Sequence, residues 1–439
     1  MAKIMKADAV VIGSGIGGIL CGCLLGREGY KVVILERMTH PGGRYTTIER
    51  NGFKINTGSW AVGLHGTNGP LWKLMADLGA RIEIKVPQPI HARLWVKGKD
   101  LALPPKGQLG FILEAISKSK KEYERVIGAV RKALKWQEPS DELTCDQWLQ
   151  QYTDNPLIHG QFNFFTRAMT GTYYDVFPAG EYFRLLRGFG QCGSLTAMPK
   201  NGQKTTVEAL LKLLKQWKVD LLLETRAEKI VCADSKIEGV TAVQSDGDSL
   251  EIDSNIVISN AGPKETVKLA GNANFDKGFM KEINELEPTR AVVNVFGYKK
   301  QILDYESHIQ FIDMERLGTA WEPCHIWPEY APPGMQCLYT YSTMKTGDTK
   351  KELPLIIDEC KARFPALDKA TVVSTLVFKD DWPVLRARPT RCLDIRTPVY
   401  GLYLAGDAVN VSGWTCGEGI SFSSRAIAED IKRRLPKAV

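Results

Sequence analysis

The sequence predicts an α/β fold in which a domain with a parallel sheet is interleaved with a second domain of the α+β type. Three stretches predict the first domain. Residues 7–36 read as strand, glycine turn, helix and strand, residues 204–261 as a helix followed by short strands, and residues 402–434 as strand, glycine turn and helix. The two regions between them, about 60–195 and 265–395, contain most of the Trp and Tyr and lack the pattern of buried parallel strands.

The first stretch is a βαβ unit. Residues 7–13, Ala-Asp-Ala-Val-Val-Ile-Gly, form a short apolar run that ends in glycine, as buried strands do. Residues 16–29 are rich in small and aliphatic side chains and predict a helix, and residues 31–36 predict a second buried strand. This order within about 30 residues is typical of a Rossmann-like fold.

The second and third stretches complete the same domain. Residues 204–214 predict a helix. Short strands bounded by turn residues are expected at 219–223, 228–234, 238–244, 249–253 and 256–261. Near the C-terminus, residues 402–405 predict a strand and about 419–434 a helix.

The composition is that of an ordinary globular protein. Of the 439 residues, 44% are hydrophobic and 24% charged, which excludes a disordered or collagen-like chain. No apolar run reaches the roughly 18 residues of a spanning helix. The net charge of +7 is small for this length, so we expect no nucleic-acid partner.

The ten cysteines include no Cys-x-x-Cys pair. We therefore expect no metal site and no disulfide redox centre. Free thiols suit a reducing compartment, and the N-terminus runs directly into a strand without a signal peptide. These features predict a cytoplasmic protein.

A glycine motif marks a dinucleotide site. Gly13-Ser14-Gly15-Ile16-Gly17-Gly18 follows a predicted strand and opens a helix, and Glu36 ends the next strand. Gly13 permits the tight turn, Gly15 lets the backbone approach a pyrophosphate, and Gly18 lets helix and sheet pack closely. Glu36 is placed to accept hydrogen bonds from ribose hydroxyls and disfavours a 2′-phosphate. The site therefore fits FAD or NAD rather than NADP.

Motifs far apart in the chain select FAD, because a long flavin dinucleotide needs contacts from distant segments. Pro41-Gly42-Gly43-Arg44 follows Glu36, and Arg44 supplies a positive partner for the phosphates or the flavin. Gly406-Asp407 ends the last strand, where its carboxylate can reach the ribityl hydroxyls. Gly417-Glu418-Gly419 opens the last helix, whose N-terminus can stabilise negative charge on reduced flavin. A second match, Gly188 to Gly193, lacks a preceding strand, so no nicotinamide site is expected there.

These motifs together resemble the phytoene desaturase/flavin amine oxidase superfamily of FAD enzymes. Further matching segments are Phe53-Lys54-Ile55-Asn56-Thr57-Gly58 and Val257-Ile258-Ser259-Asn260-Ala261-Gly262-Pro263, and the Ser-Asn-Ala-x-Pro pattern is nearer the phytoene desaturase branch. The resemblance implies a glutathione-reductase-like fold and FAD held without a covalent bond, since the motif around a covalent flavin cysteine is absent at Cys416. Asn56 stands where that branch often has Asp.

The resemblance and the motifs together assign a cofactor site. Its residues are Gly13, Gly15, Ile16, Gly17, Gly18, Glu36, Arg37, Gly42, Gly43, Arg44, Gly58, Ser59, Ala261, Gly406, Asp407, Gly417, Gly419 and Ile420. The FAD-binding domain is predicted to comprise residues 1–60, 196–264 and 396–439. The substrate-binding domain is predicted to comprise residues 61–195 and 265–395.

Aromatic residues crowd residues 148–189 and 321–341, and a subset of them could line an apolar tunnel to the flavin. Candidate catalytic acids or bases are His65, Tyr173 and Tyr339, with His65 placed best because it follows Gly58-Ser59. A structural role for this histidine is the alternative. Amine oxidases often use a lysine near the flavin, and Lys204 and Lys345 are the candidates here.

Residues 109–134 predict a long amphipathic helix with basic residues on its polar face. Two interpretations stay open. The apolar face packs on its own domain, or the helix lies on an anionic membrane as a peripheral contact.

The expected function is that of an FAD-dependent oxidoreductase that desaturates, saturates or isomerises carbon–carbon bonds in an apolar small molecule, with isoprenoids as a candidate class, by hydride transfer at flavin N5. The electron donor or acceptor is not indicated. A flavin amine oxidase is the alternative enzyme. The alternative without catalysis is a prenyl-binding protein similar to the Rab GDP-dissociation inhibitors, which the complete set of FAD motifs disfavours.

Overall fold

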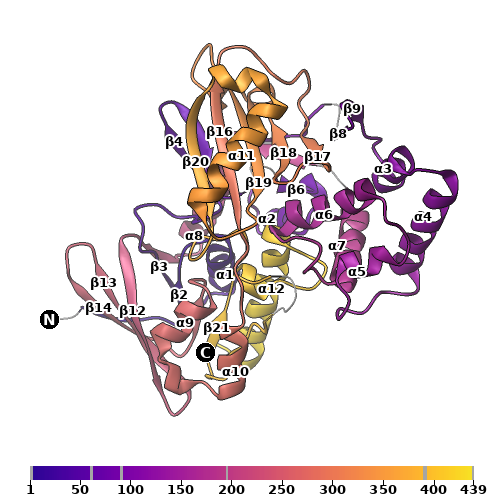
Figure 1. The fold of residues 1–439 in the computed structure, drawn as a ribbon. Helices are drawn as coiled ribbons and strands as arrows, with labels where there is room; N and C mark the ends of the chain where they lie inside the picture. Colours follow the sequence, from indigo (N-terminus) through magenta and orange to yellow (C-terminus); the bar gives the residue numbers. More distant parts are fainter. Residues whose placement is uncertain (1–2, 60–62, 89–91, 194–195, 389–392, 438–439) are drawn as a thin grey trace.

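The computed structural model describes residues 3–59, 63–88, 92–193, 196–388 and 393–437. The domain boundaries predicted at 60–61 and at 195 fall at least partly outside the described residues, as does Cys392. Figure 1 shows a parallel sheet with helices at the base of the molecule, a large second sheet above it and a helical lobe to one side.

The base of the molecule is a five-stranded parallel sheet in the order β11-β3-β2-β15-β21. Its strands come from three distant parts of the chain, which confirms the predicted α/β class. They are β2 (Ala9–Ile12), β3 (Val32–Leu35), β11 (Asp220–Leu222), β15 (Val257–Ser259) and β21 (Leu402–Leu404). Every residue of β2 and β3 is buried, because the sheet is covered on both faces.

Successive side chains of these strands enter two different cores. Val11 and Ile34 pack against helices α1 (Ile16–Arg27), α8 (Gln203–Gln216) and α12 (Cys416–Arg434). Val10 and Val33 face a second layer on the other side. Each such side chain contributes about 1.5–3 kcal/mol when fully buried, so burial of β2 on both faces helps to position the glycine turn that follows it.

The second layer is a four-stranded sheet with two helices beside it. The elements are β1 (Lys3–Lys6), β12 (Thr225–Ala233), β13 (Lys236–Gln244), β14 (Ser249–Asp253), α9 (Pro263–Ala270) and α10 (Lys277–Asn284). The N-terminal strand β1 pairs in parallel with β14, and the sequence pattern predicts no strand over these residues.

The upper sheet has seven strands, mostly antiparallel, in the order β20-β16-β19-β18-β17-β8-β9. They are β8 (Arg93–Val96), β9 (Lys99–Ala102), β16 (Ala291–Tyr298), β17 (Ile309–Phe311), β18 (Leu317–Trp321), β19 (Gln336–Thr343) and β20 (Thr371–Phe378). Helix α11 (Thr349–Arg363) contacts β18. The chain first enters this sheet at β8 and β9, returns to it after α10 and leaves it after β20.

The helical lobe contains α3 (Gln108–Ile116), α4 (Lys120–Lys135), α5 (Cys145–Gln150), α6 (Pro156–Thr170) and α7 (Ala179–Cys192) (Figure 1). The single helix predicted over 109–134 is wrong. The chain is extended at Ser117, and the Ser119 hydroxyl caps α4 by accepting from Glu122 N–H. Most apolar residues of both helices pack in the core of the lobe, although Phe111 of α3 is 39% exposed, and the basic side chains of α4 lie outside.

The remaining elements are short. They are the hairpin β4 (Thr47–Arg50) and β5 (Phe53–Asn56), the strands β6 (Gly63–Leu64), β7 (Ile84–Lys85) and β10 (Thr196–Pro199), helix α2 (Pro70–Asp77), and the 3-10 turns Gly66–Asn68, Asn272–Asn274, Pro323–His325, Pro328–Tyr330, Pro365–Lys369 and Asp407–Val409. The second glycine match, Gly188 to Gly193, lies at the end of helix α7 and just beyond it, without the strand that a nucleotide loop requires. In the part of the chain described here, no helix is both long enough and apolar enough to span a membrane.

Candidate cofactor and active site

A cavity of about 960 Å³ opens where β2 and β3 end and runs beneath the upper sheet. Sixteen of the predicted cofactor residues line it. They are Gly13, Gly15, Ile16, Gly17, Glu36, Arg37, Gly42, Gly43, Arg44, Gly58, Ser59, Ala261, Gly406, Asp407, Gly417 and Ile420. Residues separated by some 400 positions in the sequence therefore share one cavity.

The other two predicted residues, Gly18 and Gly419, do not line the cavity. A Cβ on Gly18 would lie 2.1 Å from the carbonyl oxygen of Gly13, and one on Gly419 would lie 2.4 Å from Asn410 Oδ1. Both glycines thus permit close packing beneath the cavity wall. For Gly18 this is the packing role that its place in the motif predicts.

The nucleotide end of the cavity, as we call the part around Glu36, is built mainly from backbone. Gly13 has φ +94°, which favours glycine, and turns the chain from β2 into α1. Glu36 is buried at the end of β3, where Oε2 accepts from the Ser14 amide at 2.8 Å and from the Ser14 hydroxyl at 2.6 Å, and Oε1 accepts from Met38 N–H. These bonds fix the carboxylate toward the cavity.

An ion pair that the sequence did not reveal crosses the cavity wall. Arg44 donates to both oxygens of Asp407, at 2.7 and 3.1 Å, and also to the carbonyl oxygens of Pro383 and Val384. The Arg386 amide donates to the same carboxylate at 2.7 Å. Burial acts to raise the pKa of Asp407, but the charge and hydrogen bonds of Arg44 outweigh it and hold that pKa below its usual range.

The opposite part of the cavity, which we call the apolar end, is walled by Tyr45, Leu71, Phe378, Trp382 and Cys416. Trp382 and Cys416 also pack against the core under the upper sheet, which includes Phe378. The Trp382 indole N–H donates to the carbonyl oxygen of Thr57. Side chains from the upper sheet, from helices α2 and α12 and from two loops therefore exclude water from this end.

Glu418 is the buried carboxyl group beside the apolar end. Its Oε2 accepts from Leu71 N–H at 2.7 Å, at the start of α2, and only 3% of the residue is exposed. Burial raises the pKa of Glu418 to about 7, and the Leu71 hydrogen bond offsets only part of this effect. The group therefore exchanges a proton near neutral pH.

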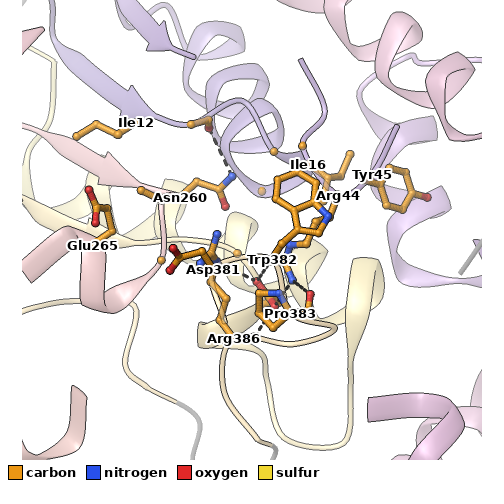
Figure 2. A pocket seen from close by; sticks show the side chains of 18 of the residues that line it. Ile12, Ile16, Arg44, Tyr45, Asn260, Glu265, Asp381, Trp382, Pro383 and Arg386 are labelled. Carbon is orange, nitrogen blue, oxygen red and sulfur yellow. Dashed lines mark hydrogen bonds and ion pairs between the residues drawn. The ribbon is translucent and has the colours of Figure 1, made fainter. Parts of the chain in front are cut away.

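Several lining residues were missed by sequence reasoning. The largest set belongs to the return segment, residues 379–388, which leads from β20 back toward β21 (Figure 2). Its backbone pairs with Thr289: Val384 N–H donates to the Thr289 carbonyl, and Leu385 N–H donates to the Thr289 hydroxyl. No local motif marks this segment, because its place depends on a partner almost a hundred residues away.

The three predicted catalytic residues lie outside the lining of the cavity. His65 is buried, with Nδ1 at 2.6 Å from the Gly193 carbonyl oxygen and the ring against Phe189, and burial lowers its pKa. The Tyr173 hydroxyl donates to the Thr343 carbonyl at 3.2 Å. The Tyr339 hydroxyl donates to the Lys54 carbonyl in the core of the upper sheet.

The candidate lysines and the aromatic clusters are also elsewhere. Lys204 pairs with Glu208 on α8, and Lys345 pairs with Glu315. None of the aromatic residues noted in 148–189 and 321–341 lines the cavity, and most are buried in the cores of the helical lobe and the upper sheet. The tunnel expected from those clusters does not form part of this cavity.

The cavity fits an FAD molecule in shape and in chemistry. A Cβ on Gly43 would lie 3.6 Å from the Gly15 Cα, and a Cβ on Gly17 would come within 3.1 Å of Gly406 N, so main chain from three segments makes the cradle. Glu36 lies at one end for a ribose, and an apolar wall lies at the other for a flat ring. A group of this length and polarity is what the donor set can hold.

Known proteins resemble this chain over nearly its whole length. The family described as flavin containing amine oxidoreductases matches residues 16–431. An uncharacterised protein of Methanocaldococcus jannaschii is 26% identical over 413 residues, which cover 94% of this chain and 96% of that protein. A phytoene desaturase of Cercospora nicotianae is 25% identical over 292 residues, which cover 58% of this chain and 45% of that enzyme. An oxidoreductase structure from Methanosarcina mazei shares the fold, with a TM-score of 0.87 at 22% identity over 97% of this chain and 100% of that one.

Proposed function

The chain belongs to the family of flavin containing amine oxidoreductases and uses FAD, and from this premise we propose that it acts on carbon–carbon bonds of an apolar substrate. The reaction is desaturation, saturation or double-bond isomerisation, and polyprenoids are the candidate substrate class. When bound, FAD supplies a carrier for two electrons and a hydride. The partial match to a phytoene desaturase supports this choice of reaction.

The observation that carries the proposal is the wall of the apolar end. Tyr45, Leu71, Phe378, Trp382 and Cys416 present rings, methyl groups and a thiol there. Apolar walls orient a hydrocarbon chain and exclude the water that would compete for a hydride or a carbocation.

The positions of the lysines support the same choice. Among the described residues that line the cavity, the lysines are Lys264 and Lys268, both on α9. Helix α9 contacts β12, whose first residue, Thr225, donates its amide to the Glu36 carbonyl. These lysines therefore lie toward the nucleotide end of the cavity rather than at its apolar end.

Glu418 supplies the proton chemistry in this proposal. Because Oε2 is held by Leu71 N–H, the carboxyl proton resides on Oε1. With a pKa of about 7, the group can give or take a proton as a carbon–carbon bond is made or reduced. It replaces His65, Tyr173 and Tyr339 as the leading candidate, because it lines the cavity and they do not.

Cys416 lines the cavity without being suited to bind FAD covalently. Burial raises the pKa of its thiol to about 11, so little thiolate forms at neutral pH. We expect acid precipitation of the protein to release all of its flavin into the supernatant. Flavin that stays with the pellet would contradict a non-covalent site.

Anaerobic mixing tests the proposal. The FAD-loaded chain is mixed with a polyprenoid, with a diamine and with buffer, and the visible absorption of flavin is followed. Bleaching by the polyprenoid, with a product that has lost two hydrogen atoms, supports desaturation. For saturation, chemically pre-reduced enzyme reoxidises with the polyprenoid, and for isomerisation a product of unchanged mass forms. Bleaching by the diamine alone, followed by hydrogen peroxide on admission of air, would identify an amine oxidase instead.

A further inference from the structure

The cavity contains an arginine whose guanidinium donates no hydrogen bond to any of the residues that the structure describes. Arg386 lies in the return segment and lines the cavity, and its side chain is 24% exposed. Its nearest carboxylate oxygen, Asp407 Oδ1, is 4.0 Å from Nε, beyond hydrogen-bond distance. Within the described parts of the chain, its guanidinium donates no hydrogen bond.

The neighbouring charges explain why this guanidinium stays unsatisfied. Both oxygens of Asp407 already accept from Arg44, and Oδ2 also accepts from the Arg386 amide. Burial and, to a smaller extent, the positive charge of Arg44 lower the pKa of Arg386. Asp381, in the same segment, is the other acidic group that faces it. An additional anion would balance the positive charge of Arg44 and Arg386 in this part of the cavity.

Arg44, the arginine of the Pro-Gly-Gly-Arg motif, cannot fill that role with its terminal nitrogens. Its Nη1 donates to the Pro383, Val384 and Asp407 oxygens, and its Nη2 donates to Asp407. Arg44 thus ties the motif to the return segment. The Arg386 guanidinium, in contrast, keeps its donors for a ligand in this region.

The position of Arg386 brings those donors to the loop that supports the glycine turn. A Cβ on Gly262 would come within 2.7–2.9 Å of the Arg386 side chain, so the guanidinium lies directly over Gly262. Two residues earlier in the same loop, the Asn260 backbone packs against Gly13, and Asn260 Nδ2 lies against Gly15 (Figure 2). Arg386 and the N-terminus of α1 therefore border the same part of the cavity.

We propose that the Arg386 guanidinium binds the diphosphate of FAD, opposite the N-terminus of α1. The diphosphate is the anionic part of the cofactor, and a planar guanidinium can donate two parallel hydrogen bonds to its oxygens. The amides and the helix dipole of α1 would hold the other side. Cofactor binding then joins the parallel-sheet part of the protein to a segment that leads out of the upper sheet, whatever the substrate is.

The test compares Arg386→Ala, Arg386→Lys and a control, Arg388→Ala, in the full-length deflavinated chain. Arg388 lies two residues away and pairs with Glu287, outside the cavity lining. Dissociation constants are measured for FAD, for ADP, which carries the diphosphate, and for riboflavin, which carries no phosphate. Thermal unfolding of each variant without ligand checks that it is folded.

Loss of charge-assisted hydrogen bonds predicts about 10- to 100-fold weaker binding of FAD and ADP by Arg386→Ala. Riboflavin binding and the control should change less than about twofold, and Arg386→Lys should fall between Ala and wild type. At about 1 M salt the difference between wild type and Arg386→Ala should shrink. Should Ala not fold, the Lys variant carries the same comparison.

Two results would overturn the assignment. One is FAD affinity that is unchanged in Arg386→Ala. The other is an equal loss of riboflavin affinity, because this would mean that Arg386 acts on the ring end or on the shape of the cavity rather than on the diphosphate.

Discussion

The nucleotide end and the apolar end of the cavity are built in opposite ways. At the nucleotide end, contacts come from main chain at the Gly13–Gly18 turn and from one carboxylate, Glu36, at the end of a neighbouring strand. At the apolar end, they come from side chains that different elements bring together, among them Trp382 of the return segment. A site built from a turn leaves a local motif in the sequence, whereas a site built from packed side chains does not.

The largest expected effect concerns the ion pair between Arg44 and Asp407, both of which line the cavity. Asp407→Ala leaves Arg44, whose side chain is 20% exposed, without its carboxylate, and breaking a buried pair typically destabilises a protein by about 3–5 kcal/mol. FAD binding should weaken as well. Chemical denaturation and flavin fluorescence measure the two effects. The control, Asp154→Ala, removes a carboxylate that is 91% exposed and should change the unfolding free energy by less than about 1 kcal/mol.

Glu418→Gln tests the proton carrier at the apolar end. Because the folded-state pKa of Glu418 is raised from 4.5 to about 7, its contribution to stability is full below about pH 4.5 and is lost as the pH rises through about 7. Gln still accepts from Leu71 N–H but does not ionise. The variant should match wild type near pH 4.5 and exceed its unfolding free energy near pH 8 by up to about 3 kcal/mol.

The control for this comparison is Glu114→Gln, on the exposed face of α3. It should follow the wild-type dependence of stability on pH. A Glu418→Gln variant that also follows the wild-type curve would show that the carboxyl is ionised throughout this range, and the proposed proton carrier would then be wrong.

Gly18→Ala tests whether the nucleotide end depends on close backbone packing. The new methyl group would overlap the Gly13 carbonyl, so the turn must shift, and we expect a loss of about 1–3 kcal/mol in unfolding free energy. Gly128→Ala is the matched control, because no atom lies within 4 Å of a Cβ at that position in α4. It should stabilise the chain by about 0.5–1 kcal/mol. Equal effects of the two substitutions would contradict the packing role of Gly18.

The sequence predicts the nucleotide end better than the apolar end, because a turn leaves a local motif and packed side chains do not. The glycine turn, Glu36 and Gly406 could be placed because each sits at the end of a strand whose apolar pattern is clear. Trp382 and Arg386 could not, because their segment is positioned by hydrogen bonds to Thr289.

His65 shows how nearness in sequence misleads. It follows the lining residues Gly58 and Ser59, yet its backbone has φ +63° and its ring turns to Gly193 and Phe189 in the helical lobe. A left-handed residue reverses the chain locally, and the sequence gives no sign of it at a histidine. Similarly, the aromatic residues of the lobe fill its own core, since a second domain needs one.

Tyr173→Phe has the smallest expected effect. The hydroxyl donates to the Thr343 carbonyl away from the cavity, so its loss should cost less than about 1.5 kcal/mol and leave the rate of flavin reduction unchanged. Stopped-flow absorption measures that rate. A tenfold slower reduction with wild-type stability would return Tyr173 to the reacting centre and extend the apolar end toward the helical lobe.

A crystal structure of the FAD-loaded chain tests the central claim most directly, namely that the two regions hold one cofactor between them. The account predicts adenosine at Glu36, the diphosphate between the α1 N-terminus and Arg386, and the flavin ring against Tyr45 and Trp382. A flavin ring near Glu36, or a cofactor that leaves the return segment without contact, would contradict it.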